Sequence, residues 1–272
     1  MPEADLHTHT TASDGRLSPS SLVRLAAGQG LAAVAICDHD TTDGLDEAIE
    51  EAQTAGIEVV PSVEINTDVG FTELHVLGYF IDHRNEVLRQ ALVFLRDARE
   101  RRGRQMVAQL QRIGVPVTFE QVLHMSGGGA IGRPHVARAL VSAGVAPDIN
   151  QAFAKYLVRG APGYVERVRF SPAEAVRLIL ESGGVPGIAH PAKIGNENLW
   201  IDLIPHGLRA IEVLHPDHSV TDVRRYQRAA RKRGLLPTGG SDYHGPASGR
   251  LSVLGEPCVP LSWVDALRKS AI

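Results

Sequence analysis

The residues best suited to chemistry are histidines and carboxylates that recur beside short apolar segments. His7 and His9 are separated by one residue near the start of the chain, and Asp14 follows after a short polar turn. Side chains at positions i and i+2 of a strand point to the same face, so both imidazoles can reach one divalent ion. Further candidates follow later apolar runs: His39, Glu64, His75, His190, Asp242 and His244.

These nitrogen and oxygen donors, without a thiolate among them, suit divalent ions such as Mn²⁺, Fe²⁺ or Zn²⁺. Packing several carboxylates and imidazoles together away from water is costly unless a cation is bound. A single histidine at a strand end is more often explained by a hydrogen bond to a backbone carbonyl. The recurrence of donors at successive strand ends therefore favours a metal centre.

Composition narrows the class of protein. The 272 residues are 43% hydrophobic and 22% charged, with a formal net charge of −3, so no overall basic field indicates nucleic-acid binding. Cys37 and Cys258 lie far apart and form no CxxC pair, which suits a reducing cytoplasm. We expect no signal peptide, no membrane partner and no transmembrane segment, and the sequence assigns no oligomeric state.

The order of predicted elements indicates an α/β fold. Helices are expected at residues 18–28 and 45–55, and strands at 31–37, 57–63 and 74–80. The strand pattern resumes at residues 184–189 and 208–214, followed by a basic helix at 220–234 and a last strand near 236–240. This alternation predicts a parallel barrel or open sheet with its chemistry at the carboxyl ends of the strands, where His39 and Glu64 fall.

The middle of the chain has a different pattern. Residues 86–113 are helical and charged, and the following stretch to about residue 163 remains helical with glycine-rich interruptions. We predict a helical insertion that caps the site. The predicted division is therefore a first barrel part at residues 1–98, the cap at 99–170 and a second barrel part at 171–272.

The ordered series DLHTHT, SDG, CDHD, VEI, ELHVLG, AHP and GSDYH resembles the motifs of the PHP (polymerase and histidinol phosphatase) family. The resemblance covers essentially the whole chain and implies a distorted (β/α)7 barrel with a mainly helical insertion. GRPHVARAL and FAKYLVRGAPGYV are most similar to a subgroup of nucleoside 3′,5′-bisphosphate phosphatases that also act as 5′→3′ exoribonucleases on short RNA.

The resemblance implies three divalent ions, Mn²⁺ being the first expectation. One ion would be held by His7, His9, Glu64 and Asp242. A second would share Glu64 and add His75 and His190, and the third would take Asp14, His39 and His244. The resemblance also assigns Arg133 and His135 to binding of the substrate phosphate, together with Lys193. The subgroup usually has an arginine where this chain has Lys193, so a point charge replaces a bidentate fork.

The expected chemistry is phosphoester hydrolysis. Two ions bridged by a carboxylate can share a hydroxide that attacks phosphorus, with Asp242 orienting it and His135 as a candidate acid for the leaving group. The expected substrates are 3′,5′-bisphosphonucleotides, AMP or the 5′ end of a short 5′-monophosphorylated RNA. The alternatives are a histidinol-phosphate phosphatase and a non-catalytic metal-binding module.

We predict structural roles for several other residues near the motifs. Asp38 and Asp40 are expected to orient a ligand or cap the next helix, and Cys37 to be a buried apolar group. Five histidines outside the motifs are expected at the surface or in contact with ligand residues: His83, His124, His206, His215 and His218. Of two arginine-rich helices, the one entering the insertion, with Arg99 and Arg102, is the better candidate for contact with RNA.

Overall fold

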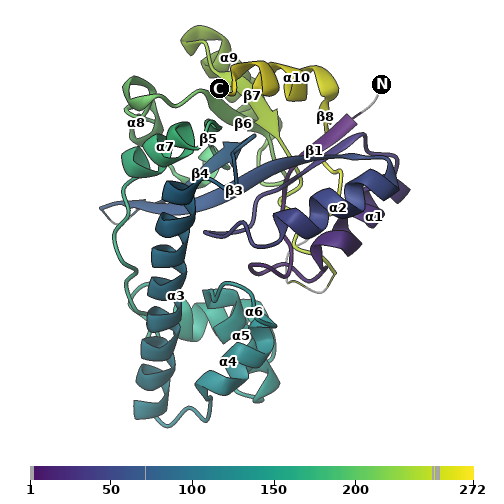
Figure 1. Ribbon diagram of the computed structural model, residues 1–272. Helices are drawn as coiled ribbons and strands as arrows, with labels where there is room; N and C mark the ends of the chain where they lie inside the picture. The colour runs from purple at the N-terminus through teal and green to yellow at the C-terminus, as the bar shows by residue number, and fades with distance from the viewer. Residues whose placement is uncertain (1–2, 71, 247, 249–251) are drawn as a thin grey trace.

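One eight-stranded sheet organises the chain in the computed structural model, which describes residues 3–70, 72–246, 248 and 252–272 (Figure 1). The strand order is β7-β6-β5-β4-β3-β2-β1-β8. The strands are β1 (Glu3–Thr8), β2 (Ala33–Ile36), β3 (Glu58–Val69), β4 (Thr72–Tyr79), β5 (Val185–Ile188), β6 (Ala210–Leu214), β7 (Leu236–Gly239) and β8 (Val259–Pro260).

The sheet is mixed, so the prediction of a parallel sheet is wrong in part. β1, β2 and β3 pair in parallel, as do β5, β6 and β7. β4 runs antiparallel to both β3 and β5 because β3 continues beyond its pairing with β2 into a hairpin with β4. Glu64 therefore lies in the middle of a long strand instead of at a strand end. It lies beyond the continuous ladder with β2, which ends at Ile36–Pro61, and forms an isolated parallel bridge with His39.

Backbone contacts at the seam between β1 and β7 nearly close the sheet into a barrel. Thr8 forms a parallel bridge with Tyr243, and the His9 N–H donates to the Tyr243 carbonyl at 2.9 Å. The buried Asp5 carboxylate accepts hydrogen bonds from the Ser241 N–H (2.9 Å) and hydroxyl. At Gly240 a Cβ would lie 2.3 Å from the His7 nitrogen, so only glycine allows the two chains to approach this closely.

Two apolar layers hold the barrel together. Small residues such as Ala33, Ala35 and Ala210 line one face of the sheet, where Tyr79 fills the space and its hydroxyl lies 3.3 Å from the Thr238 hydroxyl. The other face packs against helices that surround the sheet in Figure 1. These helices are α1 (Pro19–Gly28), α2 (Leu45–Ala55), α7 (Pro172–Glu181), α8 (Asn198–Ile201) and α9 (Val220–Arg233), and α10 (Leu261–Ser270) packs with the first layer. The predicted helices at residues 18–28, 45–55 and 220–234 are confirmed.

A second apolar core lies within the predicted cap. Helix α3 (Glu86–Arg112) leaves the barrel, where Leu88, Leu92 and Leu95 pack, and its far half carries Met106 into a separate cluster (Figure 1). That cluster also contains residues from α4 (Phe119–Ser126), α5 (Arg133–Ser142), α6 (Ile149–Ala152) and the π-helical turn Phe153–Leu157. We call residues 106–157 the helical unit. It lies inside the proposed 99–170 insertion, although α3 is continuous across residue 99.

None of the helices in the part of the chain that the structure describes is long and apolar enough to cross a membrane.

Candidate active site

Glu64 is the centre of the predicted ligand set. One of its carboxylate oxygens, Oε2, lies 3.1–3.3 Å from ring nitrogens of His7, His9 and His39. The other, Oε1, lies 2.7 Å from His75 Nδ1 and 3.1 Å from His190 Nε2. A carboxylate whose two oxygens face five imidazoles has the arrangement needed to bridge neighbouring ions.

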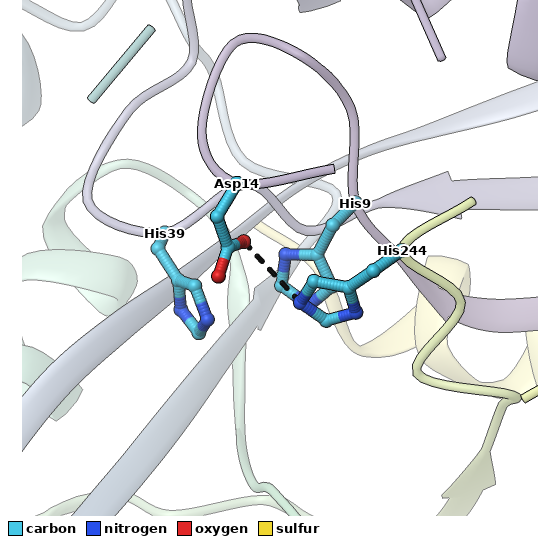
Figure 2. Close-up of side chains that lie close together, drawn as sticks. All are labelled: His9, Asp14, His39 and His244. Atoms are coloured by element: carbon cyan, nitrogen blue, oxygen red, sulfur yellow. Dashed lines mark ion pairs between the residues drawn. The ribbon is translucent and has the colours of Figure 1, made fainter. Parts of the chain in front are cut away.

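The remaining predicted ligands adjoin this centre. His9, Asp14, His39 and His244 point toward one another, with Asp14 3.2 Å from His244 (Figure 2). In each of three groups the potential ligand atoms lie within 4.8 Å of one another: His9–Asp14–His39–His244, His7–His9–Asp242 and His39–Glu64–His75. The structure thus brings all nine residues together. In this arrangement His9 and His39 each fall in two groups, whereas the family resemblance assigns each of them to one ion.

Local backbone features aim these side chains. The register of β1 against β2 shifts between Asp5 and Thr8, and such bulges redirect side chains next to active sites. Asp40, His190 and Asp242 have φ values of 54°, 29° and 50°, a left-handed conformation that is uncommon outside glycine. Each such residue costs about 1–3 kcal/mol and persists only where its surroundings enforce it. Strain is therefore concentrated at the ligand set.

The carboxylates of the site stay ionised despite burial. Burial raises the pKa of Glu64, but the charges of His39, His7 and His75 outweigh it and hold the pKa well below its usual range. Asp14 behaves in the same way: burial raises its pKa, and the charges of His244 and His39 lower it further than burial raises it. Metal ligation requires deprotonated carboxylates, and both residues meet that requirement.

The imidazoles divide into two classes. Burial lowers the pKa of His190 to about 4, so this imidazole is neutral near pH 7, and burial also lowers the pKa of His39. For His9, burial lowers the pKa, but Asp242 and Glu64 raise it further, to about 9. Asp242 and Glu64 therefore favour the protonated form of His9, which places a positive charge at the centre of the site. Divalent ions can supply that charge in place of protons.

Several buried ring nitrogens make no hydrogen bond within the described residues: both nitrogens of His9, Nδ1 of His39 and Nδ1 of His190. His9 Nε2 lies 3.2 Å from both Glu64 and Asp242, without hydrogen-bond geometry to either. Buried polar atoms are normally paired, and unpartnered ring nitrogens beside shared carboxylates are what a bound ion would satisfy. The donor set fits divalent cations.

Glu212 is a functional residue that the sequence analysis missed. It is fully buried, and its Oε1 lies 2.9 Å from His7 Nδ1 while its Oε2 accepts a hydrogen bond from the His190 N–H at 2.6 Å. The bond to Nδ1 leaves His7 Nε2 directed at Glu64. Burial raises the pKa of Glu212, but the charge of His7 outweighs burial and lowers the pKa to about 2. The available signal was one carboxylate inside the apolar run AIEVL.

Asp38 and Asp40 are predicted either to orient a ligand or to cap the next helix. Their hydrogen bonds hold segments beside the ligands. Asp38 accepts from the Thr10 N–H at 2.8 Å and from the Ser13 hydroxyl at 2.6 Å, which fixes the loop that carries Asp14. Asp40 accepts from the Asn66 N–H at 2.9 Å and pairs with Arg99. Neither one caps the next helix, which begins without a side-chain cap.

His215 and His218 are predicted either at the surface or in contact with ligand residues. Both are buried, so the prediction of a surface position is wrong. His215 Nε2 lies 3.4 Å from Asp242 Oδ2, in contact with a ligand residue.

Cys37 is fully buried, and its thiol donates a hydrogen bond to the Leu6 carbonyl. Burial raises the pKa of the thiol well above its usual range, which confirms the prediction of a buried apolar group.

A cavity of about 650 Å³ opens directly above the ligand set. Asp14, His39, Glu64, His75, His190 and Asp242 line its floor, and its walls carry Arg99, Arg102, Arg133, Arg167 and Lys193. The walls come from both the barrel and the segment around the helical unit. Arg133 Nη2 bonds both oxygens of Glu73 (2.7 and 2.9 Å), and Lys193 lies 2.9 Å from Asp217 and 3.7 Å from Asp242. Two of the three predicted phosphate ligands therefore face the cavity.

His135 lies behind the cavity wall, buried in the first turn of α5. Its Nδ1 accepts a hydrogen bond from the Gly132 N–H at 2.9 Å, which caps the helix that carries Arg133. Burial lowers the pKa of His135 to about 4, so the imidazole is neutral near pH 7. This environment supports a role in positioning Arg133 more than a role as proton donor.

We predict that Glu212→Gln weakens metal binding. Loss of the carboxylate removes the partner that fixes His7, and such changes typically cost about 10- to 100-fold in metal affinity. Calorimetric titration of metal-depleted protein with Mn²⁺ checks this, with the exposed Glu50→Gln as a control of equal charge change. Equal Mn²⁺ affinity in the two variants would rule out the role of Glu212.

The site can now be compared with known proteins. The model of the PHP domain matches residues 5–157. The chain is 36% identical over 255 residues to a 3′,5′-nucleoside bisphosphate phosphatase of Chromobacterium violaceum, covering 92% of this chain and 90% of that protein. It is 35% identical over 249 residues to the 5′-3′ exoribonuclease Rnm of Salmonella typhimurium, covering 89% and 85%.

A solved structure of a candidate metal-dependent phosphoesterase from Bifidobacterium adolescentis superposes with a TM-score of 0.92 at 33% identity, covering 99% of this chain and 96% of that one. The ligand cluster, the barrel and these similarities agree, and the chain belongs to the PHP domain family.

Proposed function

We propose that this metal-dependent phosphoesterase removes the 5′-phosphate of nucleotides, 3′,5′-bisphosphonucleotides among them, and releases nucleotides from the 5′ end of short 5′-monophosphorylated RNA. One observation carries the proposal. A single cavity has a floor of metal-ligating residues and walls that bear four arginines and one lysine. Such a pocket suits a ligand that presents one phosphate to the floor and further negative charge to the walls.

The metal ligands in this proposal are the nine residues that surround Glu64, with Mn²⁺ the first candidate. Glu64 would be shared between ions because both of its oxygens face imidazoles. Divalent ions held there would neutralise charge on the phosphate oxygens and lower the pKa of water for attack on phosphorus. Asp242 lies at the edge of the cavity within 3.2 Å of His9, a position suited to orienting the attacking group.

The walls supply substrate binding. Glu73 holds the Arg133 guanidinium at the cavity surface, and phosphate oxygens are the other strong acceptors that a guanidinium binds. Lys193 adds a point charge next to Asp242. Arg99 is held by Asp40 at 2.6 Å, so its position depends on the loop that carries His39. These cations counter the charge of a substrate that reaches the metal ligands.

The arginine content of the walls favours nucleotide substrates over histidinol phosphate. Histidinol phosphate carries one phosphate and a cationic amine, so Arg102 and Arg167 would face a positive group. A bisphosphonucleotide or an RNA end carries a second phosphate, which these arginines can bind. The alternative of a non-catalytic module is set aside, because every ligand position is filled and the relatives are named as enzymes.

A first prediction concerns Glu64. Glu64→Ala should retain fewer equivalents of divalent metal per chain than His39→Ala, since Glu64 faces five imidazoles whereas His39 contributes one ring. Elemental analysis of both purified variants measures this, with circular dichroism to verify folding. Identical metal content would contradict a bridging role for Glu64.

A second prediction concerns Arg133. Arg133→Ala should keep full metal content while kcat/KM for a 5′-nucleotide falls by the equivalent of roughly 2–4 kcal/mol, because a charge-assisted contact to phosphate is lost. Arg101→Ala, an exposed neighbour that does not line the cavity, is the control and should behave as the parent chain. An unaltered kcat/KM in Arg133→Ala would remove this residue from the site.

A third prediction concerns the end of the substrate. The metal ligands form the floor of a pocket, so a chain end can reach them while an internal phosphodiester of a closed strand cannot. We expect hydrolysis of 5′-monophosphorylated mononucleotides and short RNA, and much slower action on 5′-hydroxyl RNA, which lacks the phosphate that Arg133 and Lys193 would bind. Gel assays of linear and circular RNA of one sequence test this, and efficient cutting of the circle contradicts the pocket.

A further inference from the structure

A second hollow adjoins the substrate cavity on the outer side of the helical unit. It is a shallow groove of about 740 Å³ lined by Gln109, Arg159, Gly160, Tyr164, Val165 and Glu166. Most of these residues belong to the segment that carries the motif FAKYLVRGAPGYV and its continuation. Phe153, at the start of the same motif, lines the substrate cavity. One stretch of chain therefore contributes to both hollows.

The residues that line the two hollows follow one another directly in the chain. Tyr164, Val165 and Glu166 line the groove, whereas Arg167 and Val168, which follow directly, line the cavity. Arg102 also lines the cavity, and its Nε donates a hydrogen bond to the Val165 carbonyl at 2.7 Å. Arg102 thus lines the cavity and bonds a residue of the groove.

Two guanidinium groups lie near the Tyr164 ring. The Arg102 carbon Cζ is 5.7 Å and the Arg159 Cζ is 5.8 Å from the centre of the Tyr164 ring, both within cation–π range. The ring is half-buried, so its position is fixed while part of it remains accessible. An aromatic ring flanked by arginines is a surface on which nucleic-acid bases stack and phosphates pair.

The charge around the ring favours an anionic occupant. Arg159 pairs with Glu166 at 2.6 Å, and both side chains are exposed, so this ion pair itself contributes little stability. Burial lowers the pKa of Arg102 to about 10, and the neighbouring charges of Arg133 and Arg167 lower it in the same direction. Arg102 remains cationic at neutral pH beside Arg133 and Arg167. A phosphodiester that passes it would be an anionic partner for its guanidinium group.

We infer that the groove binds the nucleotides that follow the 5′-terminal one in a single-stranded RNA, with a base stacked on Tyr164 and the backbone beside Arg102 and Arg159. This inference rests on the proposed function and deepens it. A mononucleotide needs only the cavity, whose 650 Å³ is already within the usual range for a small ligand. The groove thus distinguishes an RNA end from a free nucleotide.

The test compares two substrates with the Mn²⁺-loaded enzyme: adenosine 3′,5′-bisphosphate and a 5′-monophosphorylated hexaribonucleotide. Tyr164→Ala should lower kcat/KM for the hexamer by roughly ten-fold, the order of one base–aromatic stack, and leave the bisphosphate within about two-fold. Tyr164→Phe, which keeps the ring, should retain the rate on both. Arg159→Ala should weaken the hexamer reaction and reduce its salt dependence, while the exposed Arg112→Ala serves as a matched control.

Equal losses of kcat/KM on both substrates in Tyr164→Ala, or no loss on the hexamer, would overturn the proposal that the groove binds RNA. A loss in Tyr164→Phe as large as in Tyr164→Ala would also overturn it, because the ring would then not be the reason. A parent enzyme that hydrolyses only the bisphosphate would discard the groove and keep the phosphatase activity. Hydrolysis of neither substrate would reject the proposed function itself.

Discussion

The structure depends on the attraction between a few buried carboxylates and the imidazoles that surround them. Glu64 faces five histidine rings. Glu212 positions two of these histidines through hydrogen bonds to the His7 ring and to the His190 N–H. In a dry interior such charges are expensive unless each has a partner, and the pairing must satisfy both sides at once. Divalent ions are the partner that fits this donor set, so metal binding and local stability are coupled here.

The backbone strain at the site follows from the same requirement. Asp40, His190 and Asp242 adopt positive φ angles, and the β1 register shifts beside His7. These conformations cost free energy that regular strands would avoid. Asp242 directly follows the seam between β1 and β7, which is fixed by Asp5, Ser241 and the close approach at Gly240. The framework around the ligands is therefore rigid, which preorganises the donors.

The cavity above the ligand set, by contrast, is lined by separate units of the chain. The cavity floor belongs to the barrel, whereas Arg133 and Phe153 come from the helical unit and Arg102 from the helix that joins the two. Such an arrangement lets the metal-binding floor stay the same while the walls vary.

The sequence by itself determined the family, the barrel class and which residues gather at the site, because short motifs carry ligands at recognisable spacings. It also marked the helices at residues 18–28 and 220–234 correctly, since their caps and periodicity are local. Only the tertiary structure decided the antiparallel course of β4, because strand direction leaves no trace in an apolar run. Glu212 emerged for the same reason: one carboxylate in a strand gains its role from a histidine 205 residues away. The placement of Tyr164 near Arg102 likewise depends on a contact between distant segments.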